Sequence, residues 1–201
     1  MHIEILVEEQ SMEEALKILL PRMLPAETTY RLLNFQGKQN LLRQLPVRLR
    51  GYAAWITDDY RIVVLLDEDR QNCLELKQRM ETAAREAGLS TKTNSGGARF
   101  QVLNRIVVEE LEAWFLGDME AVRQAYSRIP ASLLNTPRLR NPDSVIGGTW
   151  ETLEKTLQRH GYFKGGYPKV EAARTISTHM DINRNRSKSF QVFRDGLLAL
   201  F

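Results

Sequence analysis

A continuous apolar run that stops at acidic residues constrains the fold of this chain more than any other feature. Residues 61–66 (Arg-Ile-Val-Val-Leu-Leu) have the composition of a strand covered on both faces. The run ends at Asp67-Glu68-Asp69, and an amphipathic helical pattern over residues 71–87 follows, closed by Gly88. A buried strand that leads into a helix is typical of a parallel sheet in an α/β fold.

The rest of the N-terminal half repeats this alternation. We expect strands over residues 2–7, 28–34 and 100–108. Helices are predicted between them. One starts at the N-cap Ser11 and is ended by Pro21 and Pro25, and the other covers residues 39–56 with a break at Pro46. This order predicts a doubly wound, mostly parallel sheet.

After about residue 118 the pattern becomes helical. Further helices are predicted over residues 150–160, 168–180 and 189–200. We therefore expect an α/β core over residues 1–118 and a helical, basic C-terminal extension over residues 119–201 that packs on the core.

The charge is unevenly distributed along the chain. Residues 1–100 hold 14 basic and 14 acidic residues, whereas residues 137–201 hold 11 basic and 6 acidic ones. A basic tail beside an acid-centred domain suits a polyanionic partner such as nucleic acid, although a solvated helix face would have the same composition. The apolar stretches are all shorter than a membrane span, and the N-terminus lacks the basic start of a signal peptide, so we expect a cytoplasmic protein.

Acidic residues follow three of the predicted strands. Glu8 follows the first strand, and Asp67 and Asp69 follow the third. Because parallel strands end at one edge of a sheet, these side chains are expected to meet there. Carboxylates that lie together repel one another unless a cation offsets their charge, and hard oxygen ligands favour Mg²⁺ or Mn²⁺. We expect Glu8, Asp67 and Asp69 to be metal ligands.

The fourth predicted strand leads into Glu109-Glu110-Leu111-Glu112-Ala113-Trp114. Glu110 and Glu112 are candidate catalytic residues together with Glu8, with a solvated helix surface as the other interpretation of both. Trp114 shares a helix face with apolar neighbours and is most simply a core residue.

Several cations are candidates for binding phosphate or a nucleic-acid backbone, although each is also a common surface residue type. Lys38 follows Gly37 in a loop after a strand, where its ammonium group can reach a phosphate oxygen. The other candidates come from the basic extension, where aromatic residues are interleaved with the first of them. They are Lys164, Lys169, Arg184, Arg186 and Lys188. The sequence has no Walker-type P-loop, so any use of ATP would come from a partner.

At this point the motifs resemble a known group. Residues 7–13 look like the Glu-centred first motif of Toprim domains, and residues 65–69 look like their Asp-x-Asp motif. More closely, the chain resembles an uncharacterised, Toprim-like bacterial family, domain of unknown function 4276, related to the Toprim domains of overcoming-lysogenization-defect nucleases. The segments that carry this closer resemblance are residues 34–38, 65–69, 110–118, 167–169 and 187–190.

The resemblance implies a Toprim-like fold, with Glu8 as general acid/base or metal ligand and Asp67 and Asp69 as metal ligands. It also implies an ATPase partner in phage or plasmid defence. Toprim motifs have Gly directly after the Glu, where this chain has Glu9.

Two function classes follow. The first is a Mg²⁺-dependent nuclease or related phosphoryl-transfer enzyme that acts on DNA or RNA. The second is a non-catalytic regulatory or binding subunit that keeps the Toprim scaffold, which Glu9 favours. A receiver-like phosphoacceptor domain is a weaker third, because it needs a lysine after a fifth strand that the sequence does not offer.

Overall fold

The strands of the sheet are built from the apolar segments that the sequence predicts. The computed structural model describes the backbone of residues 1–201 and every side chain except those of residues 134 and 135. The strands are β1 (His2–Val7), β2 (Thr29–Asn34), β3 (Tyr60–Asp67) and β4 (Val102–Val107). The helices are α1 (Gln10–Met23), α2 (Lys38–Ala53), α3 (Cys73–Glu86), α4 (Glu112–Gly117), α5 (Met119–Ala125), α6 (Thr149–Arg159), α7 (Lys169–His179) and α8 (Lys188–Leu198), with short 3₁₀ turns at Ala131–Asn135, Pro137–Leu139 and Pro142–Ser144.

The sheet formed by the described residues is parallel throughout, with the strand order β2-β1-β3-β4. From β1 the chain moves outward to β2 through α1, and from β3 it moves outward in the other direction to β4 through α3. The direction of winding therefore reverses between β1 and β3, which is where ligands bind in sheets of this class. The predicted α/β, doubly wound fold with helices at the C-terminus is confirmed, and it is consistent with a Toprim-like arrangement.

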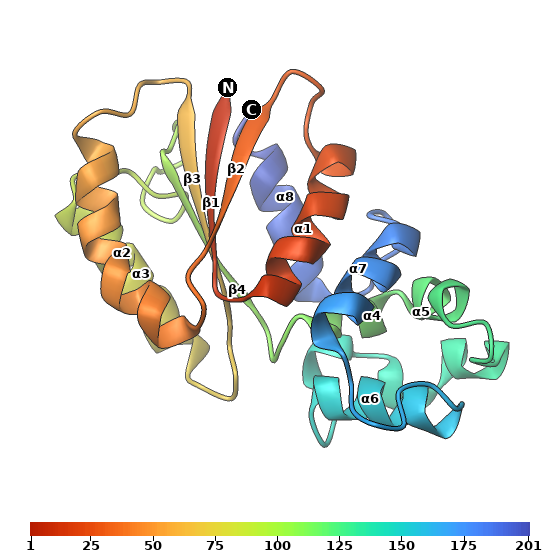
Figure 1. Cartoon of the computed structure of the whole chain (residues 1–201). Helices are drawn as coiled ribbons and strands as arrows, with labels where there is room; N and C mark the ends of the chain where they lie inside the picture. The colour runs from red at the N-terminus through yellow and green to blue at the C-terminus, as the bar shows by residue number, and fades with distance from the viewer.

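Helices cover both faces of the sheet, as Figure 1 shows. Side chains alternate along each strand, so that Ile5 of β1 and Val63 of β3 face α1 and α8, while Leu6 and Val64 face α2 and α3. All four side chains are fully buried. The central strands are thus apolar on both faces, which explains their unbroken hydrophobic sequence.

The helices after residue 118 pack onto the same core as the sheet. Ile176 of α7 and Phe193 of α8 belong to the apolar cluster that holds Ile5 and Val63. In Figure 1, α4, α5 and α6 lie beside the carboxyl ends of the strands, whereas both chain termini lie at the opposite end. The division into residues 1–118 and 119–201 stays a prediction.

Two predicted helix limits are wrong. The break expected at Pro46 is absent from the described helix α2, which continues because Leu42, Leu45 and Leu49 on both sides of the proline are buried against the sheet. Helix α1 likewise begins one residue before Ser11, with Glu9 as its N-cap, and it runs past Pro21 to Met23, so that it ends before Pro25. Tertiary packing outweighs the local cost of proline in both helices.

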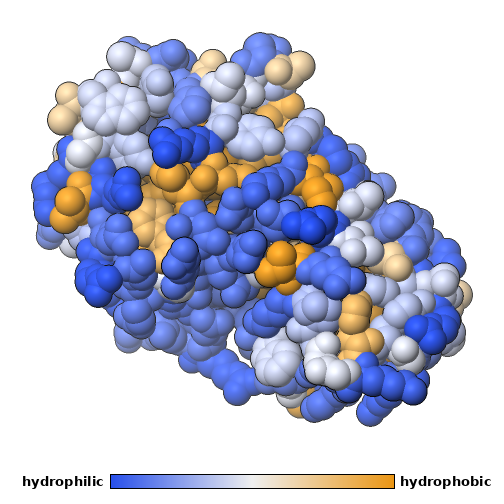
Figure 2. Space-filling view, viewed as in Figure 1, coloured by the Kyte–Doolittle hydropathy of each residue, from blue (hydrophilic) through white to orange (hydrophobic). Residues whose placement is uncertain are grey.

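The outer edge of β2 is only partly covered. Figure 2 shows hydrophobic side chains in a band across the middle of this face, where β2 forms the edge of the sheet. Leu33 of β2, Val47 of α2 and the half-exposed Trp55 line a hollow there. None of the described helices is long and apolar enough to cross a membrane.

Candidate active site

The carboxyl ends of β1 and β3 bring two predicted site residues together. Glu8 directly follows β1, and Asp67 is the last residue of β3. The backbone N–H of Asp67 donates a hydrogen bond to Oε2 of Glu8 across 3.3 Å. Glu8 is 9% exposed and Asp67 is 4% exposed. The pair lies at the point where the winding of the sheet reverses, the position in which this fold class binds its ligands.

Neighbouring loops hold this pair in place. The carbonyl of Glu8 accepts a hydrogen bond of 2.7 Å from the N–H of Gly37, whose φ of 123° suits a glycine. On the other side, Asp69 has a left-handed backbone with φ of 48°, and its N–H donates to the carbonyl of Glu109. The loop after β1 is therefore bonded to the loop after β2, and the loop after β3 is bonded to the loop after β4.

Burial and repulsion oppose the ionisation of both carboxyl groups. Burial raises the pKa of Glu8 to about 7, with Asp69 adding to the rise and Lys38 opposing it. The pKa of Asp67 is raised well above its ordinary value by burial and then by the charges of Glu8 and Glu9. Oδ1 of Asp67 is buried and has no hydrogen-bond partner among the described residues. A positive charge beside these groups would relieve the repulsion.

Glu112, at the start of α4, extends the acidic cluster. It is 1% exposed, and burial raises its pKa to about 7, with Lys169 opposing the rise. Tyr167 lies beside it, and burial together with the Glu112 charge raises the pKa of the tyrosine well above its ordinary value. Although burial disfavours the charge of Lys169, the carboxylates Glu112, Glu9 and Glu110 outweigh it and raise the lysine pKa.

Glu110 caps the start of α6 and lies at the open side of the cluster. Its Oε2 accepts hydrogen bonds from the Thr149 hydroxyl at 3.2 Å and from the Trp150 N–H at 3.3 Å. Burial raises its pKa, and Lys169 opposes the rise. Glu110 lines an open hollow of about 290 Å³ together with Asp69 and Trp150. This carboxylate therefore meets solvent at the rim of the site.

Lys38 lies inside the cluster rather than on the surface. It is 6% exposed, and its ammonium group pairs with Oδ2 of Asp69 at 2.7 Å and donates to the carbonyl of Glu68 at 3.1 Å. The predicted phosphate-binding residue and the predicted metal ligand Asp69 thus contact each other. Lys38 and Lys169 supply two positive charges against the carboxyl groups of Glu8, Glu9, Asp67, Asp69, Glu110 and Glu112.

The carboxylates of the cluster are the type of ligand that a hard cation prefers, but their side chains are not positioned to bind one ion together. Oε2 of Glu112, like Oδ1 of Asp67, is a buried carboxylate oxygen with no hydrogen-bond partner among the described residues. Carboxylate oxygens are the ligands that Mg²⁺ prefers. However, no three Asp, Glu, His or Cys side chains of the described part of the chain are placed to hold one ion together. Binding would therefore require side-chain rotation, for example of Asp69 away from Lys38.

Comparison with known protein families shows the family to which the chain belongs. The sequence model of the family described as Domain of unknown function (DUF4276) matches residues 7–198. The chain belongs to this family. No curated protein and no solved structure matches it. The match extends from the end of β1 to the last residue of α8, so the family includes both the acidic cluster and the C-terminal helices.

In this DUF4276 chain the predicted basic residues do not form one group with the acidic cluster. Lys169 lies in the cluster, with its ammonium group 5.7 Å from the ring centroid of Trp150. Lys164, Arg186 and Lys188 are exposed, and Lys188 donates its backbone N–H to the Asp143 carboxylate. Lys164 and Lys169 come from the loop before α7 and its first turn, whereas Arg186 and Lys188 come from the start of α8.

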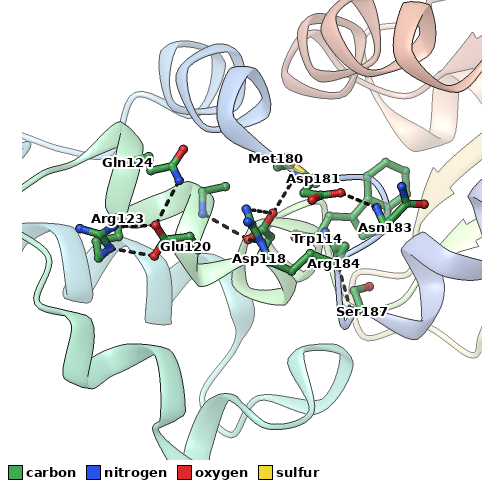
Figure 3. Close-up of polar contacts among 12 residues, drawn as sticks. Trp114, Asp118, Glu120, Arg123, Gln124, Met180, Asp181, Asn183, Arg184 and Ser187 are labelled. Carbon is green, nitrogen blue, oxygen red and sulfur yellow. Dashed lines mark hydrogen bonds and ion pairs between the residues drawn. The ribbon is translucent and has the colours of Figure 1, made fainter.

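Arg184 has a structural partner, shown in Figure 3. Its Nε and Nη2 donate to the two carboxylate oxygens of Asp118 at 2.9 and 3.0 Å. Asp118 is 2% exposed and also accepts from the backbone N–H groups of Ala121 and Asp181. This network joins the start of α5 to the segment between α7 and α8, so the donors of Arg184 that face Asp118 are already used.

Sequence reasoning missed the roles of Asp118 and Trp150. Asp118 ends the segment of residues 110–118 that carries the family resemblance, and its position before α5 was a signal for an N-cap. Trp150 had no such signal, because its place beside Glu110 and Lys169 depends on how α6 packs.

Proposed function

We propose that the protein is a Mg²⁺-dependent nuclease or a related phosphoryl-transfer enzyme of the Toprim type that acts on nucleic acid. The observation that carries the proposal is the contact between Glu8 and Asp67 at the reversal point of the sheet, with a buried Asp67 oxygen left unpaired. Pairs of buried carboxylates with raised pKa values are typical of catalytic sites.

Glu8, Asp67 and Asp69 are the residues that would hold the ion. A bound Mg²⁺ would neutralise these carboxylates and polarise a phosphodiester oxygen. Release of Lys38 from Asp69 would free its ammonium group to bind a phosphate oxygen. Lys169, close to the carboxylates of Glu110 and Glu112, is a second cation for the substrate backbone.

Glu110 is the proposed proton acceptor from water. It is the predicted catalytic residue that lines the open hollow, and its raised pKa brings it closer to neutral pH. Glu112 is too deeply buried to reach water, so its proposed role is to position Lys169 and Tyr167. The proposed substrate is DNA or RNA, and the proposal includes an ATPase partner because the resemblance to Toprim-like families implies one.

The test is a double substitution, Asp67→Ala with Asp69→Ala. Purified protein is incubated with single-stranded and duplex DNA and RNA in Mg²⁺ or Mn²⁺, with and without a chelator. We expect metal-dependent cleavage by the wild type and none by the variant, with an unchanged circular dichroism spectrum. The control Glu27→Ala with Glu86→Ala removes two exposed carboxylates from the opposite end of the sheet. Cleavage that survives the Asp67 and Asp69 changes would refute the assigned site.

A second candidate function is a non-catalytic regulatory or binding subunit on the same scaffold. The ion pair of the buried Lys38 with the exposed Asp69 favours it, because the lysine already supplies a cation to the site. Glu9, in place of the usual Gly, favours it as well. Calorimetric titration with Mg²⁺ separates the two functions, since a scaffold neutralised by its own lysine would release no binding heat.

A further inference from the structure

A buried arginine lies at the end of the sheet opposite to the acidic cluster. Arg61, near the start of β3, is 2% exposed. Its Nη1 donates to the carbonyls of Asp58 at 2.8 Å and Tyr60 at 2.6 Å. Its Nε and Nη2 are buried without a hydrogen-bond partner among the described residues. A guanidinium group buried in this way is costly unless an anion lies nearby.

A second arginine lies beside it. Ile62 pairs with Val102, so Arg61 lies next to Gln101 on the neighbouring strand segment. Gln101 in turn lies two residues after Arg99 in the chain. Burial, followed by the charge of Arg99, lowers the pKa of Arg61, while Asp58 and Asp59 oppose that effect. No salt bridge joins either arginine to a carboxylate of the described side chains.

A hollow of about 410 Å³ lies between the segment before β4 and the end of α8. Arg99 lines the hollow together with Lys92, Ser95 and Gly97. Lys92 is likewise without a salt bridge among the described side chains, and its ammonium group is 6.0 Å from the ring centroid of Phe100. Side chains alternate along β3, so Arg61 points to the face of Val63, which α8 also covers.

Aromatic side chains complete the hollow. Phe100 is buried below it, whereas Phe201 is 57% exposed and also lines it. The loop at its rim has left-handed glycines, Gly96 with φ of 60° and Gly97 with φ of 90°. Unpaired cations, a glycine loop and an exposed ring match the chemistry of a phosphate group attached to a base.

We propose that Lys92 and Arg99 bind the phosphate of a nucleotide or of a nucleic-acid strand in this hollow, and that Arg61 adds buried positive charge behind them. The hollow lies at the amino end of the strands, and the acidic cluster lies at the carboxyl end. The proposal therefore does not rest on metal-dependent cleavage, and either one can fail alone.

The test measures binding in a chelator, so that the acidic cluster contributes no metal-dependent signal. Isothermal titration calorimetry of the full chain uses inorganic pyrophosphate, ADP and a short oligodeoxythymidine as probes. We expect binding that weakens with salt. Lys92→Gln with Arg99→Gln should weaken it about tenfold or more, because charge-assisted contacts are lost. Arg79→Gln with Arg85→Gln, an equal charge change on the exposed face of α3, is the control and should leave it unchanged.

The Arg61→Met variant tests the buried charge separately. Without a probe its melting temperature should equal or exceed that of the wild type, since an unpaired buried charge is removed. With a probe, the rise in melting temperature should be smaller than in the wild type.

Binding of ADP identifies a free nucleotide as the ligand, and binding of the oligonucleotide alone identifies a nucleic-acid backbone. If no probe binds, or if the Lys92 and Arg99 double variant binds as tightly as the wild type, the proposal is wrong.

Discussion

The backbone N–H of Asp67 donates to the carboxylate of Glu8 across 3.3 Å, although 59 positions separate the two residues in the chain. This contact joins the carboxyl ends of β1 and β3 and places two carboxyl groups where burial and mutual repulsion oppose their ionisation. Such an arrangement destabilises the fold, and proteins keep features of that kind mainly at functional sites.

Asp67→Asn should stabilise the protein in the absence of metal. The amide replaces a carboxyl group whose ionisation is opposed by burial and by the charges of Glu8 and Glu9. The variant keeps the backbone N–H that donates to Glu8. We expect the free energy of unfolding in a chelator to rise by about 1 kcal/mol or more. Urea denaturation measures it, with Glu86→Gln as an exposed control that should change stability by less than about 0.5 kcal/mol. A loss of stability in Asp67→Asn would contradict this account of the site.

Mg²⁺ should raise the melting temperature of the wild type. An ion that binds only the folded protein, at a free concentration of about 100 times its dissociation constant, adds about 2.7 kcal/mol to the free energy of unfolding. Glu8→Gln should lose this stabilisation, because Glu8 is one of the three proposed ligands. Thermal denaturation with increasing Mg²⁺ measures the effect. An unchanged wild-type melting temperature would favour the regulatory scaffold over the enzyme.

The stability difference between Glu8→Gln and the wild type should depend on pH. Folding raises the pKa of Glu8 from 4.5 to about 7, so the folded state binds a proton more tightly than the unfolded state. The stability from this group is present below pH 4.5 and is lost as the pH rises to about 7. In a chelator, Glu8→Gln should therefore gain stability relative to the wild type across this window, by on the order of 3 kcal/mol at most. Chemical denaturation at several pH values measures it, and a constant difference would be inconsistent with the raised pKa.

The fold and the position of the acidic site could be predicted because both depend on local patterns. The apolar run over residues 61–66 requires a buried strand, and β3 extends it by only one residue at each end. Parallel strands must end at one edge, so the meeting of Glu8 with Asp67 follows from their place after β1 and at the end of β3. No side-chain detail was needed for either expectation.

Side-chain partners that are distant in sequence could not be predicted in the same way. The sequence offered Lys38 and Asp69 as separate ligands of phosphate and metal, yet the two side chains pair with each other, and the backbone of Asp69 is left-handed. The continuity of α2 through Pro46 is of the same kind, since it depends on packing against the sheet. Such contacts are decided by tertiary structure.

Arg184 is a further example, and it allows a clear prediction. The sequence placed it among the residues that contact nucleic acid, whereas its guanidinium group pairs with the buried Asp118 across 66 positions. Arg184→Ala should lower the free energy of unfolding by about 2 kcal/mol, because Asp118 stays buried with only its two backbone donors. Arg159→Ala, which changes an exposed arginine of α6, should change it by less than about 0.5 kcal/mol.

Denaturation of both variants, together with the salt dependence of their binding to an oligonucleotide, measures the two roles of Arg184. A structural residue alters stability and leaves the slope of binding against salt unchanged, while a backbone contact reduces that slope by about one. If Arg184→Ala reduces the slope and leaves stability unchanged, the ion pair with Asp118 is not the main role of this arginine.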